Sequence, residues 1–224
     1  MKITENKIKN VFITQICNLI IEKAIYFINL NDSFSLVLSG GNTPKDVFIE
    51  LSNKKYLNQI NWKKVHFFWL DDRCVHLKSE HSNYRLAHEL LISKINITGS
   101  INYINGDLSP VDSLKDYRKK IFNYFGKDKI SFDFILLGMG LDGHVASIFP
   151  GSNEFSNKHN IVVKTKKKHN KYKRISFTLK TINNSKFNLL IINDQNKWFI
   201  LKNNDKDLPI NNIKIDEIIY LNEK

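Results

Sequence analysis

Hydrophobic and polar positions follow one another in blocks that predict short buried strands separated by amphipathic helices. Apolar residues recur at three- and four-residue steps from Thr4 to Leu30, which predicts one long helix with Thr4 in the capping position. Nearly continuous apolar runs are typical of strands buried on both faces of a parallel sheet, and they occur at 34–38, 65–70, 132–137, 187–192 and 218–221. Two shorter strands are expected at 101–104 and 161–163. This alternation predicts an α/β domain with a mainly parallel sheet.

Capping residues mark where several of the helices begin. Thr43 precedes Pro44, and Ser82 and Ser109 stand before the next two helical patterns. The helix after Ser109 is expected to run to a stop at Gly126. A last helix is expected around Trp198.

Length and composition favour one globular domain over residues 1–224. Hydrophobic residues make up 42% of the chain, which is ordinary for such a domain. No apolar run of membrane-span length is expected, and the N-terminus lacks the layout of a signal peptide. The two cysteines form neither a disulfide framework nor a Cys-x-x-Cys metal pattern. These features predict a cytoplasmic protein without a bound metal.

The net charge of +12 is open to three interpretations. Clustered cations would suit a nucleic-acid-binding protein, but the excess is spread along the chain and no basic motif with interleaved aromatic residues is present. A general preference for Asn, Lys and Ile would also produce this charge. The third interpretation is that some cations serve a small anionic substrate.

A glycine turn follows the predicted strand at 132–137 and carries two reactive side chains. Gly138 and Gly140 interrupt the apolar run, and Asp142 and His144 come directly after them. Ligands bind at the carboxyl edge of open α/β sheets, so these side chains are expected at a site. A carboxylate beside an imidazole suits general acid–base catalysis near neutral pH. The alternative is a tight turn with a solvated Asp and His.

Two further segments follow strands in the same way. Ser39-Gly40-Gly41-Asn42-Thr43-Pro44 leads from a strand into a helix, where free backbone N–H groups and the helix dipole favour a phosphate. Asp71-Asp72-Arg73 follows the strand at 65–70, and Arg73 can hold a phosphate or carboxylate through paired N–H donors. Alone, each segment is also compatible with an ordinary loop.

The stretch from Gly138 to Gly151 resembles the hallmark of 6-phosphogluconolactonases, in which Gly-Met-Gly-x-Asp-Gly-His leads into Ala-Ser-x-Phe-Pro-Gly. The related glucosamine-6-phosphate deaminases share the first part, but they resemble Ile-Ala-Phe-Asn-Glu-Pro afterwards. Here no acidic residue occurs between His144 and Glu154, which favours the lactonases. Segments 39–44, 71–75 and 82–85 also resemble lactonase segments.

The resemblance implies a three-layer α/β/α sandwich with a mainly parallel sheet, of the sugar-phosphate isomerase-like kind. It implies hydrolysis of 6-phosphogluconolactone, with His144 as general base and Asp142 as its orienting partner or a ligand for a sugar hydroxyl. No metal or organic cofactor is required for this reaction. The residues expected around the substrate and its phosphate are Ser39, Gly40, Gly41, Thr43, Asp71, Arg73, Gly140, Gly143, Arg174 and Lys197.

Neighbouring residues are given supporting or neutral roles. Asn83 and Arg85 are expected to support the Arg73 loop, and the lysine-rich run 164–173 is expected to be a solvated loop. The alternatives to a lactonase are a glucosamine-6-phosphate deaminase, a non-catalytic sugar-phosphate-binding domain and, more remotely, an RNA-binding module. A small-molecule substrate, no nucleic-acid or membrane partner and a monomeric state are favoured.

Overall fold

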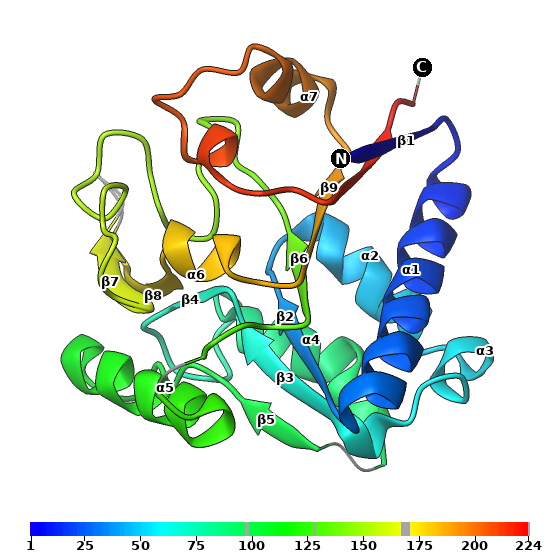
Figure 1. The fold of residues 1–224 in the computed structure, drawn as a ribbon, viewed down its shortest axis with the longest axis horizontal. Helices are drawn as coiled ribbons and strands as arrows, with labels where there is room; N and C mark the ends of the chain where they lie inside the picture. The colour runs from blue at the N-terminus through cyan, green and yellow to red at the C-terminus, as the bar shows by residue number, and fades with distance from the viewer. Residues whose placement is uncertain (97–98, 128, 167–170, 224) are drawn as a thin grey trace.

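A seven-stranded parallel sheet forms the centre of the protein (Figure 1). The computed structural model describes residues 1–96, 99–127, 129–166 and 171–223. All neighbouring strands of this sheet pair in parallel. In their order across the sheet, the strands are β1 (Lys2–Asn6), β10 (Glu217–Leu221), β9 (Phe187–Ile192), β6 (Phe134–Leu137), β2 (Phe34–Leu38), β3 (Val65–Trp69) and β5 (Ser100–Asn102).

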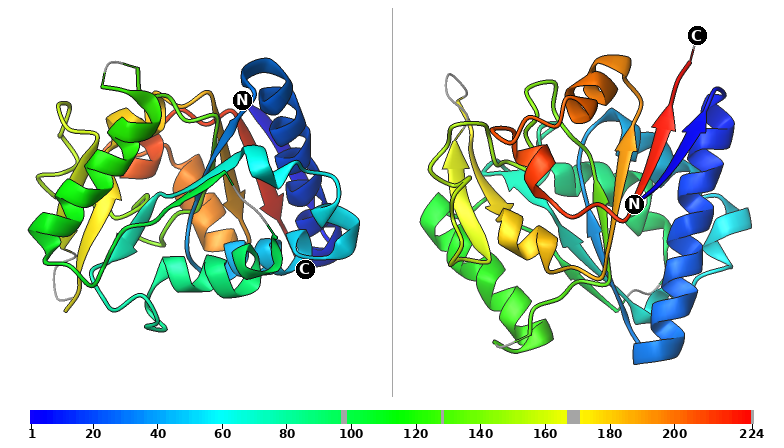
Figure 2. Two further views of the ribbon diagram at one scale, coloured as in Figure 1. Left: turned by 90° about the horizontal axis from the view of Figure 1, so that it is seen from below. Right: turned by 45° about the horizontal axis from the view of Figure 1, so that its top comes forward.

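Helices cover both faces of this sheet. On one face α1 packs against α2, and α2 packs against α4, whereas α5 lies on the opposite side (Figure 2). The predicted three-layer α/β/α sandwich with a mainly parallel sheet is therefore confirmed. The helices are α1 (Lys9–Asn31), α2 (Asn42–Leu51), α3 (Lys54–Leu57), α4 (Asn83–Leu90), α5 (Pro110–Phe125), α6 (Leu179–Asn183) and α7 (Gln195–Lys202), with 3-10 turns at Trp62–Lys64, Ile92–Lys94 and Pro209–Asn212.

The order of the strands reverses between β2 and β6, at the middle of the sheet. From β2 the chain proceeds outward to β3 and β5, whereas from β6 it proceeds the other way, to β9 and β10. The connections that leave β2 and β6 therefore separate to opposite faces. Such a switch point opens a crevice at the carboxyl ends of the two strands.

A small antiparallel sheet is attached to the same edge. It consists of β4 (Asp71–Arg73), β8 (Lys173–Phe177) and β7 (Val162–Lys166). Leu70 connects the two sheets, because its N–H donates to Leu38 O at 2.9 Å and its carbonyl accepts from Phe177 N at 2.9 Å. The small sheet thus forms a wall beside the crevice.

Two serines fix the position of β2 against β6. Near the amino end of β2, the N–H and hydroxyl of Ser35 donate to Asp133 Oδ2 at 2.7 and 2.8 Å, and Asp133 N donates to Ser35 Oγ at 2.8 Å. Lys186 pairs with the other carboxylate oxygen at 2.7 Å. At the opposite end, the Ser39 hydroxyl donates to the carbonyl of Leu136. The two loops that follow these strands are therefore held in a defined position relative to each other.

Helix α1 is a core helix whose composition also fits a membrane span. By length and apolar composition alone this helix could cross a membrane, so the expectation that no such segment exists is wrong. In the structure one side of this helix packs into the hydrophobic core. Its buried residues are Phe12, Ile13, Ile16, Cys17, Leu19, Ile20, Ile21, Ala24 and Phe27.

Two predicted helix starts are wrong. Thr4 belongs to β1, because residues 2–6 pair with β10, and α1 begins only at Lys9 without a side-chain cap. Helix α2 begins at Asn42, one residue before Thr43, because Gly41 takes the capping position with φ 109°. The predicted caps Ser82 and Ser109 are confirmed, since each side chain accepts a backbone N–H of its helix.

The lysine-rich run 164–173 is not simply a loop. Its first residues complete β7 and Lys173 begins β8, so strand pairing extends into the run from both sides. Residues 167–170 lie outside the part of the chain that the structure describes.

The buried Asp133 carboxylate generates a first prediction. Asp133→Asn places an amide NH2 against either the Ser35 donors or Lys186, so we expect unfolding to become easier by about 1–3 kcal/mol. The measurement is urea denaturation. Glu22→Gln, at a largely exposed carboxylate of α1, is the matched control and should change stability by less than about 0.5 kcal/mol. Equal losses in the two variants would show that the contacts of Asp133 with Ser35 and Lys186 do not stabilise the fold.

Candidate active site

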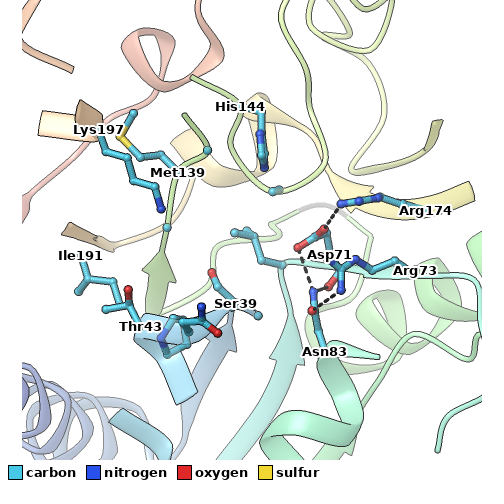
Figure 3. A pocket seen from close by; sticks show the side chains of 18 residues that line it. Ser39, Thr43, Asp71, Arg73, Asn83, Met139, His144, Arg174, Ile191 and Lys197 are labelled. Atoms are coloured by element: carbon cyan, nitrogen blue, oxygen red, sulfur yellow. Dashed lines mark hydrogen bonds and ion pairs between the residues drawn. The ribbon is translucent and has the colours of Figure 1, made fainter. Parts of the chain in front are cut away.

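A pocket of about 280 Å³ opens at the carboxyl ends of β2, β3, β6 and β9 (Figure 3). It lies at the switch point of the sheet, where the fold alone predicts a ligand site. Polar and apolar groups contribute about equally to its lining, and the apolar side chains include Leu70, Met139 and Ile191. The lining residues are Ser39, Gly40, Gly41, Asn42, Thr43, Pro44, Leu70, Asp71, Arg73, Asn83, Gly138, Met139, Gly140, His144, Ala146, Arg174, Ile191 and Lys197.

His144 and Asp142 form a hydrogen-bonded pair at this pocket. Imidazole Nδ1 bonds to Asp142 Oδ1, which favours the tautomer with the proton on Nδ1. Nε2 is then the nitrogen that can accept a proton from a bound molecule. The Phe149 ring packs against the imidazole, with ring centroids 4.9 Å apart. Asp142 and Phe149 thus fix the imidazole in place.

The turn that carries this pair requires glycine at two positions. Gly140 N donates to His144 O at 3.0 Å, and Gly143 N donates to Gly140 O at 3.0 Å. A Cβ on Gly140 would lie 2.1 Å from His144 Nδ1 and 2.5 Å from Asp142 Oδ1. Gly143 has φ 75°, and a Cβ there would lie 2.9 Å from Leu208. The turn therefore brings its backbone close to both reactive side chains.

Asp71 is a nearly buried carboxylate on the wall formed by β4. Its Oδ2 accepts the hydroxyl of Ser147, and Asn83 Nδ2 donates to its backbone carbonyl at 2.9 Å. Arg174 Nη1 lies 4.0 Å from Oδ2. Asp71 therefore presents a negative charge to the pocket beside a guanidinium group.

Arg73 and Arg174 face each other across the β4–β8 pair. Arg73 Nη1 donates to the carbonyl of His81 at 2.8 Å, and Arg174 lies over the Phe149 ring at 5.6 Å. Burial lowers the pKa of Arg174, and the neighbouring Asp71 acts in the opposite direction. The guanidinium group remains charged, because its ordinary pKa is far above neutrality. Figure 3 shows both arginines on one side of the pocket, with Asp71 between them.

Asp72 fixes the segment that carries Asp71 and Arg73. Its carboxylate accepts the N–H groups of Arg73, Asn83 and Tyr84 at 2.7, 2.8 and 2.9 Å, and the Ser82 hydroxyl at 3.1 Å. Burial raises the pKa of Asp72 to about 6, while the backbone donors lower it. Through these hydrogen bonds Asp72 holds β4 against the start of α4.

The glycine turn after β2 packs closely on the same segment. A Cβ on Gly40 would lie 1.9 Å from Asn83 Oδ1, so only glycine fits there. Gly41 has a positive φ with open space around it, and α2 begins directly afterwards. The first N–H groups of α2 lie beside the pocket, where they suit an anion. Ser39, by contrast, uses its hydroxyl for the bond to Leu136.

Lys197 reaches the pocket from the first turn of α7. Asp194 is the N-cap of this helix, because its side chain accepts the N–H groups of Asn196 and Lys197. Figure 3 shows Lys197 across the pocket from Arg73 and Arg174. An anion inside the pocket would therefore face positive charge from two sides.

The structure places the sequence-predicted residues together. Ten of the twelve line the pocket, namely Ser39, Gly40, Gly41, Thr43, Asp71, Arg73, Gly140, His144, Arg174 and Lys197. Asp142 lines an adjoining hollow with His144 and Lys197, and Gly143 forms the turn behind them. Their roles toward a substrate stay predictions.

Arg85 and Ser147 have other roles in the structure than the sequence predicted. Arg85 pairs with Glu89 on the surface of α4 at 2.7 Å, so it does not support the Arg73 loop, whereas Asn83 does. Ser147 was not selected, although it contacts Asp71. Its only signal was its place in the Ala-Ser-x-Phe-Pro-Gly segment.

Thiol and metal chemistry have little support at this site. Burial raises the pKa of the Cys74 thiol to about 11, so the group stays protonated at neutral pH. Within residues 1–96, 99–127, 129–166 and 171–223, no three His, Cys, Asp or Glu side chains are grouped as metal ligands would be.

The fold and the pocket define a class of protein. A His–Asp pair able to transfer a proton lies at the switch point of a doubly wound sheet, within a ring of cations that suits a small anion. The chain belongs to the family of glucosamine-6-phosphate isomerases and 6-phosphogluconolactonases, whose model matches residues 8–219.

Individual relatives favour the lactonase branch of that family. The chain is 36% identical to a 6-phosphogluconolactonase of Haemophilus influenzae over 82% of this chain and 78% of the relative. The 6-phosphogluconolactonase of Thermotoga maritima is 35% identical over 80% and 78%. The solved structure of a Thermotoga maritima 6-phosphogluconolactonase covers both chains completely with a TM-score of 0.85 at 30% identity. A monomeric glucosamine-6-phosphate deaminase shares the fold at 17% identity, with a TM-score of 0.80 over 100% of this chain and 98% of that one.

The close approach of Gly140 to His144 generates a second prediction. Gly140→Ala forces the imidazole or the turn to move, and we expect this to cost about 1–3 kcal/mol of unfolding free energy. Gly138→Ala is the matched control, because a Cβ there meets nothing within 4 Å. It should change stability by less than about 0.5 kcal/mol in urea denaturation. If both variants lost the same stability, the contact with His144 would not be the cause.

Proposed function

We propose that this protein hydrolyses 6-phospho-D-glucono-1,5-lactone to 6-phospho-D-gluconate, a step of the oxidative pentose phosphate pathway. The observation that carries this proposal is the oriented His144–Asp142 pair in a pocket lined by three cations. Membership of the family and the lactonase names of the relatives support it. A lactone is an activated ester, so its hydrolysis requires only a positioned water and proton transfer.

In the proposed mechanism His144 acts first as a general base. Nε2 takes a proton from water as the water oxygen attacks the lactone carbonyl, and Asp142 stabilises the imidazolium that forms. The same imidazolium then gives its proton to the ring oxygen as the C–O bond breaks. Backbone N–H groups of the glycine turns are the proposed donors to the negative carbonyl oxygen.

The cations and the start of α2 serve the phosphate in this proposal. Arg174, Arg73 and Lys197 surround the pocket, and the first N–H groups of α2 add uncharged donors. Ser39, Gly40, Gly41 and Thr43 shape this end of the pocket. Asp71 lies beside Arg174 and lines the same pocket.

A deaminase is the alternative within the same family. Among the residues that line the pocket and its adjoining hollow, the carboxylates are Asp71 and Asp142. Glu154 is not among them, so no further acid is supplied from the segment after His144. Release of ammonia from glucosamine 6-phosphate would favour the deaminase.

We also propose that residues 1–224 form one domain that acts in the cytoplasm as a monomer. One hydrophobic core cluster extends from Phe12 to Leu221, which supports a single folding unit. In this proposal the excess positive charge serves a small anionic substrate, and no nucleic acid or membrane is a partner.

Loss of the imidazole is the most direct test. We expect His144→Ala to lower the enzyme-catalysed rate of lactone hydrolysis about 10²–10⁴-fold, because the general base is absent. The measurement is acid release from freshly made 6-phosphogluconolactone above the spontaneous rate. The exposed His159 supplies the control, and His159→Ala should behave as wild type. A wild-type protein with no rate above background would overturn the proposed function.

Phosphate recognition is tested by comparing two substrates. Arg174→Gln removes a charged double donor, so we expect KM for the phosphorylated lactone to rise about 10–100-fold. Hydrolysis of glucono-1,5-lactone, which has no phosphate, should change little. Arg118→Gln, at an exposed arginine of α5, is the matched control. An equal loss on both lactones would show that Arg174 does not recognise the phosphate.

A further inference from the structure

The two pocket arginines lie directly opposite each other, which needs a compensating charge. Arg73 and Arg174 are cross-strand partners in the β4–β8 pair. Like charges in such a position destabilise a sheet. Asp71 lies on the same strand as Arg73, and its carboxylate is 4.0 Å from the Arg174 guanidinium group.

Neutral side chains provide the hydrogen bonds that link this carboxylate to both arginines. Asp71 Oδ2 and Arg174 Nη1 are 4.0 Å apart, too far for a hydrogen bond. Ser147 Oγ lies between them, donating to Asp71 and accepting from Arg174 Nη1 at 3.3 Å. On the other side, Asn83 Oδ1 accepts from Arg73 Nη1 at 3.4 Å, while Asn83 Nδ2 donates to Asp71 Oδ1 at 3.4 Å.

The separation leaves donor groups of both arginines unused. Arg73 Nε and Arg174 Nε are buried, and neither has a hydrogen-bond partner among the residues that the structure describes. A buried N–H without an acceptor costs free energy, which an arriving oxyanion would recover. A direct salt bridge with Asp71 would instead turn the Arg174 guanidinium toward the carboxylate.

We propose that Ser147 is a positioning residue that keeps Arg174 from closing onto Asp71. Its hydroxyl satisfies the carboxylate and occupies the place that a guanidinium N–H would otherwise take. Arg174 thereby stays available for the substrate phosphate. This inference rests on the proposed function for the identity of the anion, but not for the geometry.

Ser147 is well placed to act as a rigid spacer. It is completely buried, and its N–H donates to Ser176 Oγ at 3.0 Å on β8, the strand that carries Arg174. The preceding residue, Ala146, has φ 54°, a conformation that is uncommon for a non-glycine residue. The backbone thus fixes the hydroxyl between the two charged groups.

The test combines Ser147→Ala with Asp71→Asn. In Ser147→Ala the spacer is absent, Arg174 pairs with Asp71, and we expect KM for the lactone and Kd for 6-phosphogluconate to rise about 10-fold or more. The kcat should fall by a smaller factor, because the His144–Asp142 pair is untouched. In the Asp71→Asn background a neutral amide cannot form the competing ion pair, so Ser147→Ala should then change Kd less than about 2-fold.

Calorimetric titration with 6-phosphogluconate and with inorganic phosphate gives the Kd values, and circular dichroism checks the fold. Ser156→Ala, at an exposed serine of the following loop, is the matched control and should bind as wild type. If Ser147→Ala does not fold, Ser147→Cys replaces the hydroxyl with a larger and weaker donor and should raise Kd in the wild-type background but not in the Asp71→Asn background. The same rise in both Asp71 backgrounds, or no rise in either, would overturn the proposal.

These outcomes are separate from those that decide the reaction. If the wild-type protein does not hydrolyse the lactone, the proposed function is wrong. The Kd values of the Ser147 and Asp71 variants would still show whether Ser147 positions Arg174 for an anion. Active wild-type protein with an unchanged Ser147→Ala would remove only the positioning role.

Discussion

The register between β2 and β6 is the constraint on which the site depends. The Gly40–Gly41 loop and the His144 turn follow these neighbouring strands, and a shift of one residue would turn the strands' side chains to the opposite faces. Ser35 and Asp133 lock the amino ends through a buried carboxylate, and Ser39 ties the carboxyl end of β2 to Leu136. These buried polar groups thus specify one alignment of the two strands, which apolar packing alone would not do.

Asp71 and Asp72 are neighbours on β4, but their carboxylates lie in different surroundings. Successive side chains of β4 point to opposite faces. Asp72 faces the protein, where backbone N–H groups bind it and hold α4 in place. Asp71 faces the pocket, where its carboxylate is linked to two arginines through the neutral side chains of Ser147 and Asn83. Asp72 therefore stabilises the fold, whereas the charge of Asp71 acts on the pocket.

The sequence allowed the central strands and the reactive turns to be predicted, because both have strong local signals. Strands buried on both faces leave unbroken apolar runs, and the glycines beside His144 and Asn83 are required by close packing. The strand at Lys2–Asn6 lacked such a signal, since it is an edge strand that is largely exposed and pairs with residues 217–221. The contact between Ser147 and Asp71 joins positions 76 residues apart, and no spacing rule reveals such a pair.

The pairing of β1 with β10 has a consequence for how the protein is made. Residues 2–6 are synthesised long before their hydrogen-bonding partner at residues 217–221. Until β10 is synthesised, β1 has no pairing strand and α1 lacks its contacts with β10. Closing such a distant contact carries a large loop entropy and slows folding. This edge of the sheet is thus expected to assemble after the central strands, at a late stage of folding.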